Sequence, residues 1–327
     1  QVATVQSMVR RILYNDGDTM PAVTDYDLII VDEAHRGYIL DKDMTESEVL
    51  YTDQKDYQSK YRAVIDYFDA VKIGLTATPA LQTTQIFGEP VYQYTYRQAV
   101  IDGYLVDHDA PHELKTKLST EGIHYKKGDT VTIYDPVTNE ITDGALLDDE
   151  VLDFDLDSFN RRVITENFNR AVLKEITKDI DPEAPDIQGK TLIYAVDDQH
   201  ADMIVKILKE IYADQGVDTD AIMKITGSTG GGNPKKIEEA IKRFKNERFP
   251  SVVVTVDLLT TGIDVPSITT LVFLRRVKSR ILFEQMLGRA TRLCPEIHKR
   301  VFQLYDPVGV YESLAPVTSM KPVVTNP

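Results

Sequence analysis

The chain has 327 residues, of which 42% are hydrophobic and 27% are charged, a composition typical of folded globular proteins and a length that predicts about two domains. No apolar run approaches the ~20 residues of a membrane span, no signal peptide is visible, and the single cysteine, Cys294, excludes an intrachain disulfide and favours a reducing cytoplasm. The net charge of −15 argues against general binding to nucleic acid, but residues 274–300 hold eight Lys and Arg against two Glu, and phosphate contacts respond to local potential.

The first part of the chain predicts a parallel α/β domain. Residues 26–31 and 71–75 are expected as strands, and residues 57–68 as a helix with one apolar face. Buried parallel strands read as continuous runs of Ile, Leu and Val. Open sheets of this kind bind their ligands at the carboxyl ends of the strands, so the residues that follow each strand are the first candidates for a site.

Asp32 and Glu33 directly follow the first of these strands. Asp32 is predicted to hold Mg²⁺, directly or through water, and Glu33 to orient a water molecule for attack on a phosphate. His35 is predicted to relay the state of a bound nucleotide to a second domain. The alternatives are helix-capping or solvated acids, and a surface histidine that makes one backbone hydrogen bond.

Thr76-Ala77-Thr78-Pro79 directly follows the second strand. Pro79 disfavours helix at the preceding residue and fixes a turn. The hydroxyls of Thr76 and Thr78 are predicted to couple Asp32 or Glu33 to the facing domain. The alternative is a local turn held by a threonine hydroxyl, with no further role.

The middle of the chain predicts a change of architecture followed by a second α/β series. Residues 107–160 are expected as a linker with a β-hairpin, because 130–134 alternates and 135–139 is turn-forming. A domain over 161–315 follows, and residues 316–327 are expected as a frayed tail. The expected helices of the domain over 161–315 are 161–178, 199–212, 235–245 and 279–290. Its expected strands are 191–196, 222–226, 251–256, 269–274 and 301–305.

The segment from Thr255 to Asp264 leads from a strand into a tight loop. Gly262 permits an unusual backbone angle, and Asp264 is predicted to accept a hydrogen bond from a ribose hydroxyl of the cofactor. Thr255, Thr260 and Thr261 are predicted to contact nucleic-acid phosphates. The alternative is a structural aspartate that caps the turn.

The segment 285–292 is the strongest indication of phosphate chemistry. In a helix, Gln285, Arg289 and Arg292 have the i, i+4, i+7 spacing of one face. Two guanidinium groups on one face suit phosphate oxygens and can act as arginine fingers on a γ-phosphate. The alternative is a solvated basic face, against which Gly288 argues, since a glycine within a helix suggests close approach of another backbone.

One glycine-rich segment imitates a phosphate-binding loop. Residues 227–233 lie between a predicted strand and a predicted helix, but Asn233-Pro234 stands where Lys-Ser/Thr is required. We expect a mobile surface loop there. No G-x-x-x-x-G-K-[ST] occurs in the sequence, and we expect that loop upstream of Gln1 in a longer polypeptide.

The order of these motifs resembles superfamily 2 helicases and translocases, in which they correspond to motifs II, III, V and VI, with Thr4-Val5-Gln6-Ser7 similar to motif Ib. Longer runs resemble the R (restriction and motor) subunit of type I restriction-modification enzymes, among them Asp32–Tyr38, Phe68–Ala80, Phe87–Tyr92, Tyr96–Leu105 and Leu258–Pro266.

The resemblance implies an α/β fold of two RecA-like domains with mostly parallel, doubly wound sheets, the first over 1–106 and truncated at its N-terminus. It implies an ATP- and Mg²⁺-dependent translocase of double-stranded DNA with Thr4 and Gln6 among its DNA contacts. It further implies a nuclease domain outside this chain, and methylase and specificity subunits as partners. The alternatives are another superfamily 2 DNA or RNA helicase, or a non-catalytic nucleic-acid-binding module.

Overall fold

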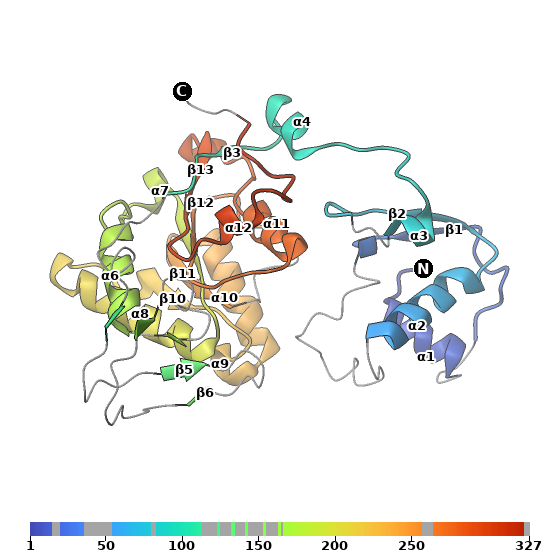
Figure 1. The fold of residues 1–327 in the computed structure, drawn as a ribbon, viewed down its shortest axis with the longest axis horizontal. Coiled ribbons are helices and arrows are strands. Elements are labelled where there is room, and N and C mark those ends of the chain that lie inside the picture. Colours follow the sequence, from blue (N-terminus) through green and yellow to red (C-terminus); the bar gives the residue numbers. More distant parts are fainter. Residues whose placement is uncertain are drawn as a thin grey trace. The chain divides into compact units, whose positions relative to one another are not determined.

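The computed structural model describes residues 1–14, 20–35, 54–79, 83–112, 123–124, 132–134, 141–142, 153–154, 163–164, 166–256 and 264–323 (Figure 1). The chain forms two compact units, Gln1–Gln93 (unit 1) and Tyr94–Pro327 (unit 2). Within the described residues, the structure contains no helix with the length and apolar character that a membrane crossing requires.

Unit 1 is a small α/β unit built on two parallel strands. Its elements are α1 (Val5–Leu13), β1 (Leu28–Val31), α2 (Gln54–Tyr67), β2 (Val71–Gly74) and α3 (Thr83–Phe87). Strands β1 and β2 pair in parallel, with Val31 opposite Gly74, so their carboxyl ends meet as the sequence predicts. The two longer helices share a core in which Met8, Val9 and Ile12 pack with Val64 and Phe68.

One face of the β1–β2 sheet is apolar and exposed. Leu28, Ile30 and Val71 are 50%, 59% and 65% exposed, and Ile73 is 42% exposed. These residues alternate along the strands, so they share one face, while Val31 on the other face is buried. Parallel sheets are ordinarily covered on both faces, and the described residues of unit 1 cover only one.

Unit 2 is organised around a six-stranded sheet in which every pair is parallel. Its strands lie in the order β10 (Ile222–Lys224), β11 (Val252–Thr255), β9 (Lys190–Tyr194), β12 (Ile268–Phe273), β13 (Val301–Tyr305) and β3 (Asp107–His108). From β9 the chain first builds toward β10 and later toward β13. Such a reversal is the switch point of a doubly wound sheet, beside which ligands bind. The predicted fold class is confirmed.

The helices of unit 2 lie between and beside these strands, and the longer ones bury apolar residues against the sheet. They are α4 (Tyr96–Ile101), α6 (Glu166–Ile176), α7 (Pro185–Gln188), α8 (Asp198–Tyr212), α9 (Thr229–Gly232), α10 (Pro234–Asn246), α11 (Arg280–Gly288) and α12 (Val310–Leu314). Every residue of β9 and β11 is buried, as expected for central strands of a parallel sheet. Phe168, Ile204 and Phe244 contribute one residue each from α6, α8 and α10 to the same core.

Short antiparallel strands lie between β3 and α6. They are β4 (Ile123–His124), β5 (Thr132–Tyr134), β6 (Ile141–Thr142), β7 (Asp153–Phe154) and β8 (Val163–Ile164). Strand β5 pairs with β6, and Tyr134 lies opposite Ile141, which confirms the predicted hairpin. The predicted turn, 135–139, lies outside the described residues.

The limits of the compact units differ from the predicted domain limits at two places. Helix α4 belongs to unit 2 because the chain after it joins the large sheet, and the Val106 N–H donates to the Thr291 carbonyl at 2.8 Å. Residues 316–323, predicted as part of a frayed tail, include the buried side chains of Thr318 and Met320. Local composition suggested a tail, whereas long-range contacts hold this segment.

A buried histidine joins two helices of unit 2 and should make its stability sensitive to acid. The Val196 N–H donates to His200 Nδ1 at 3.1 Å, and His200 Nε2 lies 3.0 Å from the Asn169 amide oxygen. Burial lowers the pKa of His200 from 6.5 to about 3. Between these values the unfolded chain binds a proton that the folded chain does not, so stability falls as the pH falls below 6.5.

We expect His200→Gln to flatten this acid dependence. The wild-type chain should lose up to about 1.4 kcal/mol of unfolding free energy per pH unit through this residue as the pH drops below 6.5. Urea unfolding at pH 7.5 and pH 5.5 measures the loss. His298→Asn, at an exposed histidine, is the control and should keep the wild-type dependence. An equal loss in His200→Gln and wild type would contradict the assignment.

Candidate functional site

The turn after β1 carries two acidic residues and holds the second of them, Glu33, in a strained backbone conformation. Glu33 has a φ of +49°, a left-handed value that non-glycine residues adopt at a cost and that clusters at functional sites. The Glu33 N–H donates to Asp32 Oδ1 at 2.9 Å. The Ala34 N–H donates to the Leu75 carbonyl at 2.9 Å, and this bond ties the turn to the end of β2.

A buried histidine links the ends of the two strands. His35, 2% exposed, places Nδ1 2.8 Å from Thr76 Oγ1 and 3.4 Å from Thr78 Oγ1. The same nitrogen lies 3.3 Å from a Glu33 carboxylate oxygen. The sequence places these residues at neighbouring strand ends, and the structure brings them together. His35 is therefore not a surface residue, and the two threonines reach Glu33 through it.

Close packing at the end of β2 supports this cluster. A Cβ at Gly74 would lie 2.9 Å from the Phe87 ring and 3.1 Å from Ala34 Cβ. Glycine is thus required where α3 and the acidic turn approach the strand. Thr78 is 4% exposed, and its N–H donates to Thr76 Oγ1 at 3.1 Å, so the predicted threonine turn forms and also contacts the histidine.

The acidic turn offers limited ligation for a metal. Asp32 is exposed and Glu33 is partly exposed, and the described residues contain no group of three or more acidic, His or Cys side chains placed to hold an ion. Mg²⁺ is usually held by one or two carboxylates together with water and substrate phosphates. A single carboxylate at Asp32 fits that mode of binding and does not fit an all-protein cage.

Helix α11 is shorter than predicted, and this changes the predicted basic face. The helix ends at Gly288, and Arg289 is its C-terminal cap. Gln285 and Arg289 keep their spacing of one turn, whereas Arg292 lies beyond the helix and does not continue its face. Among the described residues the expected close approach at Gly288 is not found, since a Cβ there would meet none of their atoms within 4 Å. The weak helix propensity of glycine instead suits the last position of the helix.

Arg292 meets a residue from another predicted motif. Its Nε lies 3.4 Å from Asp264 Oδ1, and the two side chains are 59% and 52% exposed. An ion pair this exposed adds little stability, and the contact brings together two residues that the sequence assigns to different motifs. Thr255, predicted to contact phosphates, is 0% exposed because it lies in a central strand. Thr260, Thr261 and Gly262 lie outside the described residues.

The C-terminal part of α11 lies at the carboxyl end of β9, beside the switch point. Tyr194, the last residue of β9, donates from its hydroxyl to the Met286 carbonyl at 3.2 Å. Gln285 and Arg289 flank this contact in sequence, and both are partly exposed. The structure thus places Gln285 and Arg289 near the edge of the sheet where ligands bind in this architecture.

A polar cluster at the same edge was not predicted. Asp198 begins α8 and accepts hydrogen bonds from Thr226 at 2.5 Å and Ser228 at 2.7 Å, and its other oxygen lies 2.9 Å from Lys224 Nζ. Burial is the largest single influence on the pKa of Asp198 and raises it. The hydrogen bonds from Ser228, Thr226 and Lys224 together outweigh burial, so the pKa lies below its usual value. The position of Asp198, just after a buried strand, is the signal that would have identified it.

The glycine-rich segment 227–233 is an ordered turn. Gly230, Gly231 and Gly232 have φ values of +64°, +74° and +77°, and the N–H groups of Gly231 and Gly232 donate to the Ser228 carbonyl at 2.9 and 3.1 Å. Asn233 then caps α10. The glycines supply backbone angles, not a phosphate cradle, and the segment lies at the surface as the sequence predicts.

At the other end of the chain, Thr4 is the N-cap of α1. Its hydroxyl accepts from the Ser7 N–H at 3.2 Å, and Gln6 is partly exposed in the first turn. A capping threonine satisfies one free donor of the helix start. The remaining N–H groups and the positive end of the helix are available to an anion such as a phosphate.

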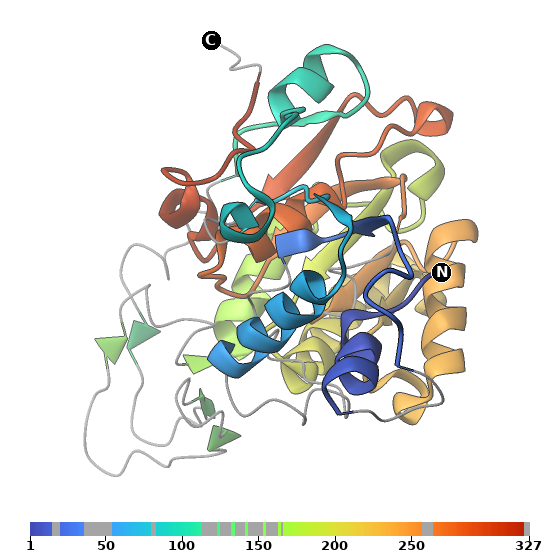
Figure 2. The same ribbon diagram turned by 90° about the vertical axis from the view of Figure 1, so that its right-hand side faces the viewer.

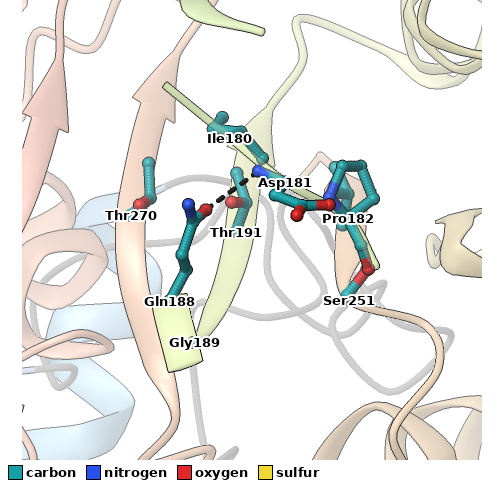
Figure 3. Close-up of a pocket in the computed structure, with 9 residues that line it drawn as sticks. Ile180, Asp181, Pro182, Gln188, Gly189, Thr191, Ser251 and Thr270 are labelled. Atoms are coloured by element: carbon teal, nitrogen blue, oxygen red, sulfur yellow. Dashed lines mark hydrogen bonds between the residues drawn. The ribbon is translucent and has the colours of Figure 1, made fainter. Parts of the chain in front are cut away.

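A small polar pocket lies at the opposite edge of the sheet of unit 2 (Figure 3). Thr191 stands near the start of β9 and Ser251 just before β11, and Asp181 and Gln188 close the side. The Asp181 N–H donates to Gln188 Oε1 at 2.9 Å. The pocket lies at the amino ends of these strands, whereas the predicted site residues of unit 2 lie at their carboxyl ends.

Cys294 lies just beyond the basic segment and is 7% exposed. Its thiol donates to a Glu296 carboxylate oxygen at 3.4 Å. Burial, and then the neighbouring Glu296 carboxylate, raises the pKa of the thiol. A buried thiol that resists ionisation is a poor nucleophile, so Cys294 is a packing residue.

Two protein-family models match this chain, one in each unit. Residues 171–294 match the family model for the helicase conserved C-terminal domain. Residues 1–81 match the model for the res subunit of type III restriction enzymes. The acidic turn lies within the match over 1–81, and the basic segment lies within the match over 171–294.

Individual relatives are more specific. The chain is 52% identical over its whole length to the endonuclease subunit of the type I restriction enzyme EcoKI of Escherichia coli K12, and it spans 27% of that protein. It is 28% identical over 86% of its length to the EcoAI endonuclease subunit of Escherichia coli, of which it spans 31%. The chain therefore corresponds to less than a third of each relative.

Two solved structures share the fold. A Vibrio vulnificus fragment, described as an HsdR subunit of a type I restriction enzyme, aligns over 92% of this chain and 47% of its own, with a TM-score of 0.61 and 24% identity. The ATP-dependent type ISP restriction-modification enzyme LlaBIII, solved on DNA, aligns over 96% of this chain and 21% of its own, with a TM-score of 0.58 and 16% identity. Over its whole length, the chain is therefore similar to a segment of the endonuclease subunits of type I restriction enzymes.

Proposed function

We propose that this chain is the ATP-driven motor part of a type I restriction enzyme R subunit, and that the complete subunit moves along double-stranded DNA. The observation that carries the proposal is the strained acidic turn whose Glu33 is tied through buried His35 to Thr76. LlaBIII, which has this fold, is described as ATP-dependent and was solved on DNA. DNA cleavage and the methylase and specificity subunits as partners follow from the family and involve segments outside this chain.

The chemistry that this turn supports is attack of water on a γ-phosphate. Glu33, 44% exposed, would accept a hydrogen bond from the water and orient it. Asp32 would hold Mg²⁺, which when bound neutralises charge on the phosphates. His35 contacts both Glu33 and Thr76, so a shift of Glu33 on loss of the γ-phosphate is passed to the end of β2.

Unit 2 would supply the charges that stabilise the transition state. Arg289 and Arg292 present guanidinium groups, and Gln285 would help to position the water or the γ-phosphate. Asp264, held by Arg292 at 3.4 Å, would accept a hydrogen bond from the ribose. Gly262 remains a proposed residue of the nucleotide site, and Thr260 and Thr261, like Thr4 and Gln6, remain proposed DNA contacts. Buried Thr255 would support the loop rather than touch a phosphate.

Two rival functions make different predictions. An RNA or repair helicase of the same superfamily would be stimulated by RNA or would release single strands. A non-catalytic nucleic-acid-binding module would bind without turnover. The strain at Glu33 disfavours the second rival, because a costly backbone angle persists where the surrounding structure maintains it, commonly at functional sites.

The complete subunit, assembled with its partners, should displace a third strand from a DNA triplex but should not release a labelled strand from a duplex. Closing two domains on each turnover moves a protein along a backbone, whereas separating strands also requires an element inserted between them. Gel assays with ATP on the two substrates measure both outcomes. Glu33→Gln is the inactive control, and efficient release of the duplex strand would favour the helicase.

A further inference from the structure

Glu284 is a buried carboxylate on α11 whose two oxygens both have partners. It is 3% exposed, and Arg280 Nη1 lies 3.0 Å from Oε2. The other oxygen, Oε1, accepts from the Ser319 N–H at 2.7 Å, the Ser319 hydroxyl at 2.9 Å and the Thr318 hydroxyl at 3.1 Å. Glu284 thus joins the helix of the basic segment to residues more than thirty positions later in the chain.

Residues 316–323, which we call the C-terminal strap, continue from this contact to the edge strand β3. His108 Nε2 lies 3.0 Å from the Met320 carbonyl oxygen, and the Val323 N–H donates to Asp107 Oδ2 at 2.7 Å. Figure 2 shows the red end of the chain running beside the teal segment that carries β3. The strap is therefore bonded to α11 at one end and to the sheet at the other.

The apolar face of α11 does not by itself determine the orientation of the helix. Phe283, Met286 and Leu287 are fully buried, but apolar contacts are not directional. Burying a carboxylate is costly unless it is fully hydrogen-bonded, and a well-packed apolar residue would serve stability as well or better. What the carboxylate adds is a set of directional bonds that fix the rotation of the helix and its position along its axis.

We propose that Glu284 is a positioning residue, which anchors α11 to the C-terminal strap so that Gln285 and Arg289 are held in register for the nucleotide. This inference rests on the proposed function. Arg289 lies five residues after Glu284, at the cap of the same short helix, so any rotation of the helix moves the guanidinium. A displacement of about 1 Å of a catalytic group can lower the rate by about 100-fold.

The test compares three variants of the complete subunit, assembled with its partners. Glu284→Ala should lower DNA-stimulated kcat for ATP by about 10- to 100-fold with KM nearly unchanged, since positioning matters most in the transition state. Glu284→Gln keeps an oxygen acceptor for the Ser319 N–H and should recover most of the rate. Glu312→Ala, at an exposed glutamate of α12, should behave as wild type.

Amide hydrogen exchange on the same proteins reads the contact independently of turnover. Glu284→Ala should lose protection at 318–320 and along α11, while strands β9 and β11 keep theirs. Unchanged exchange in these segments, or unchanged kcat in a variant that has lost their protection, would overturn the inference. A fall in kcat that tracks a global loss of protection would also overturn it. If the wild-type assembly itself lacks ATPase activity, the proposed function fails, whereas exchange still reports the anchor.

Discussion

Glu33→Gln in the complete subunit should lower ATP turnover on the order of 10³-fold while nucleotide affinity stays close to wild type. The amide keeps the size of the side chain and can still face His35, but it cannot accept a proton or orient water as a carboxylate does. The loss should fall on the chemical step, because the substitution leaves unchanged the main chain that forms the left-handed turn at Glu33. Steady-state phosphate release and equilibrium binding of a fluorescent nucleotide measure the two quantities.

Asp69→Asn is the matched control, at an exposed acid of unit 1 that precedes β2. It should leave both turnover and affinity unchanged. The chain 1–327 alone provides a blank, since it contains no G-x-x-x-x-G-K-[ST] segment and should turn over ATP negligibly. Magnesium-dependent turnover by that chain, abolished by Glu33→Gln, would contradict the assignment of phosphate binding to a loop outside it.

Arg289→Ala in the complete subunit should lower ATP turnover by about 10³-fold or more, with a far smaller effect on ATP binding. A guanidinium that acts on charge developing in the transition state contributes little to the ground state. Arg292→Ala should change turnover in the same direction. Asp264 lies 3.4 Å from Arg292 and allows a further check. Asp264→Asn removes the carboxylate that pairs with the Arg292 guanidinium but keeps the guanidinium, so it should lower turnover less.

Affinity for ADP with a metal fluoride that imitates the transferring phosphate separates the two states directly. It should fall sharply in Arg289→Ala, whereas affinity for ADP alone should not. Arg300→Ala, at an exposed arginine of the same unit, tests whether the loss of any nearby positive charge has this effect. Equal turnover in Arg289→Ala and wild type would contradict the arginine-finger assignment and favour the alternative, a solvated basic surface.

Much of the fold follows from patterns that the sequence shows locally. The expected strand 251–256 and the observed β11 (Val252–Thr255) agree because a run of valines favours a strand at the centre of a parallel sheet. The expected helix 199–212 and the observed α8 agree equally well. The cluster at His35 also follows in outline, since both of its segments end parallel strands and must meet at one edge.

Other features depend on contacts between distant residues or on where an element ends. The sequence spacing predicts Arg292 on the helix face of Gln285 and Arg289, but the helix ends at Gly288, before this residue. Thr255 carries a hydroxyl at a plausible position, yet its neighbours in the sheet bury it. Residues 316–323 have no periodicity, so their bonds to Glu284 and β3 could not be predicted.

The burial of Cys294 has a consequence for single-molecule optical work on this motor. The chain's only cysteine is 7% exposed, and its thiol resists ionisation, so maleimide dyes should react with it slowly. One cysteine engineered at an exposed position in each unit should then take donor and acceptor dyes without prior removal of the native thiol. Energy transfer between the dyes on chain 1–327 would then report how the separation of the two units varies, in a protein with an unaltered interior.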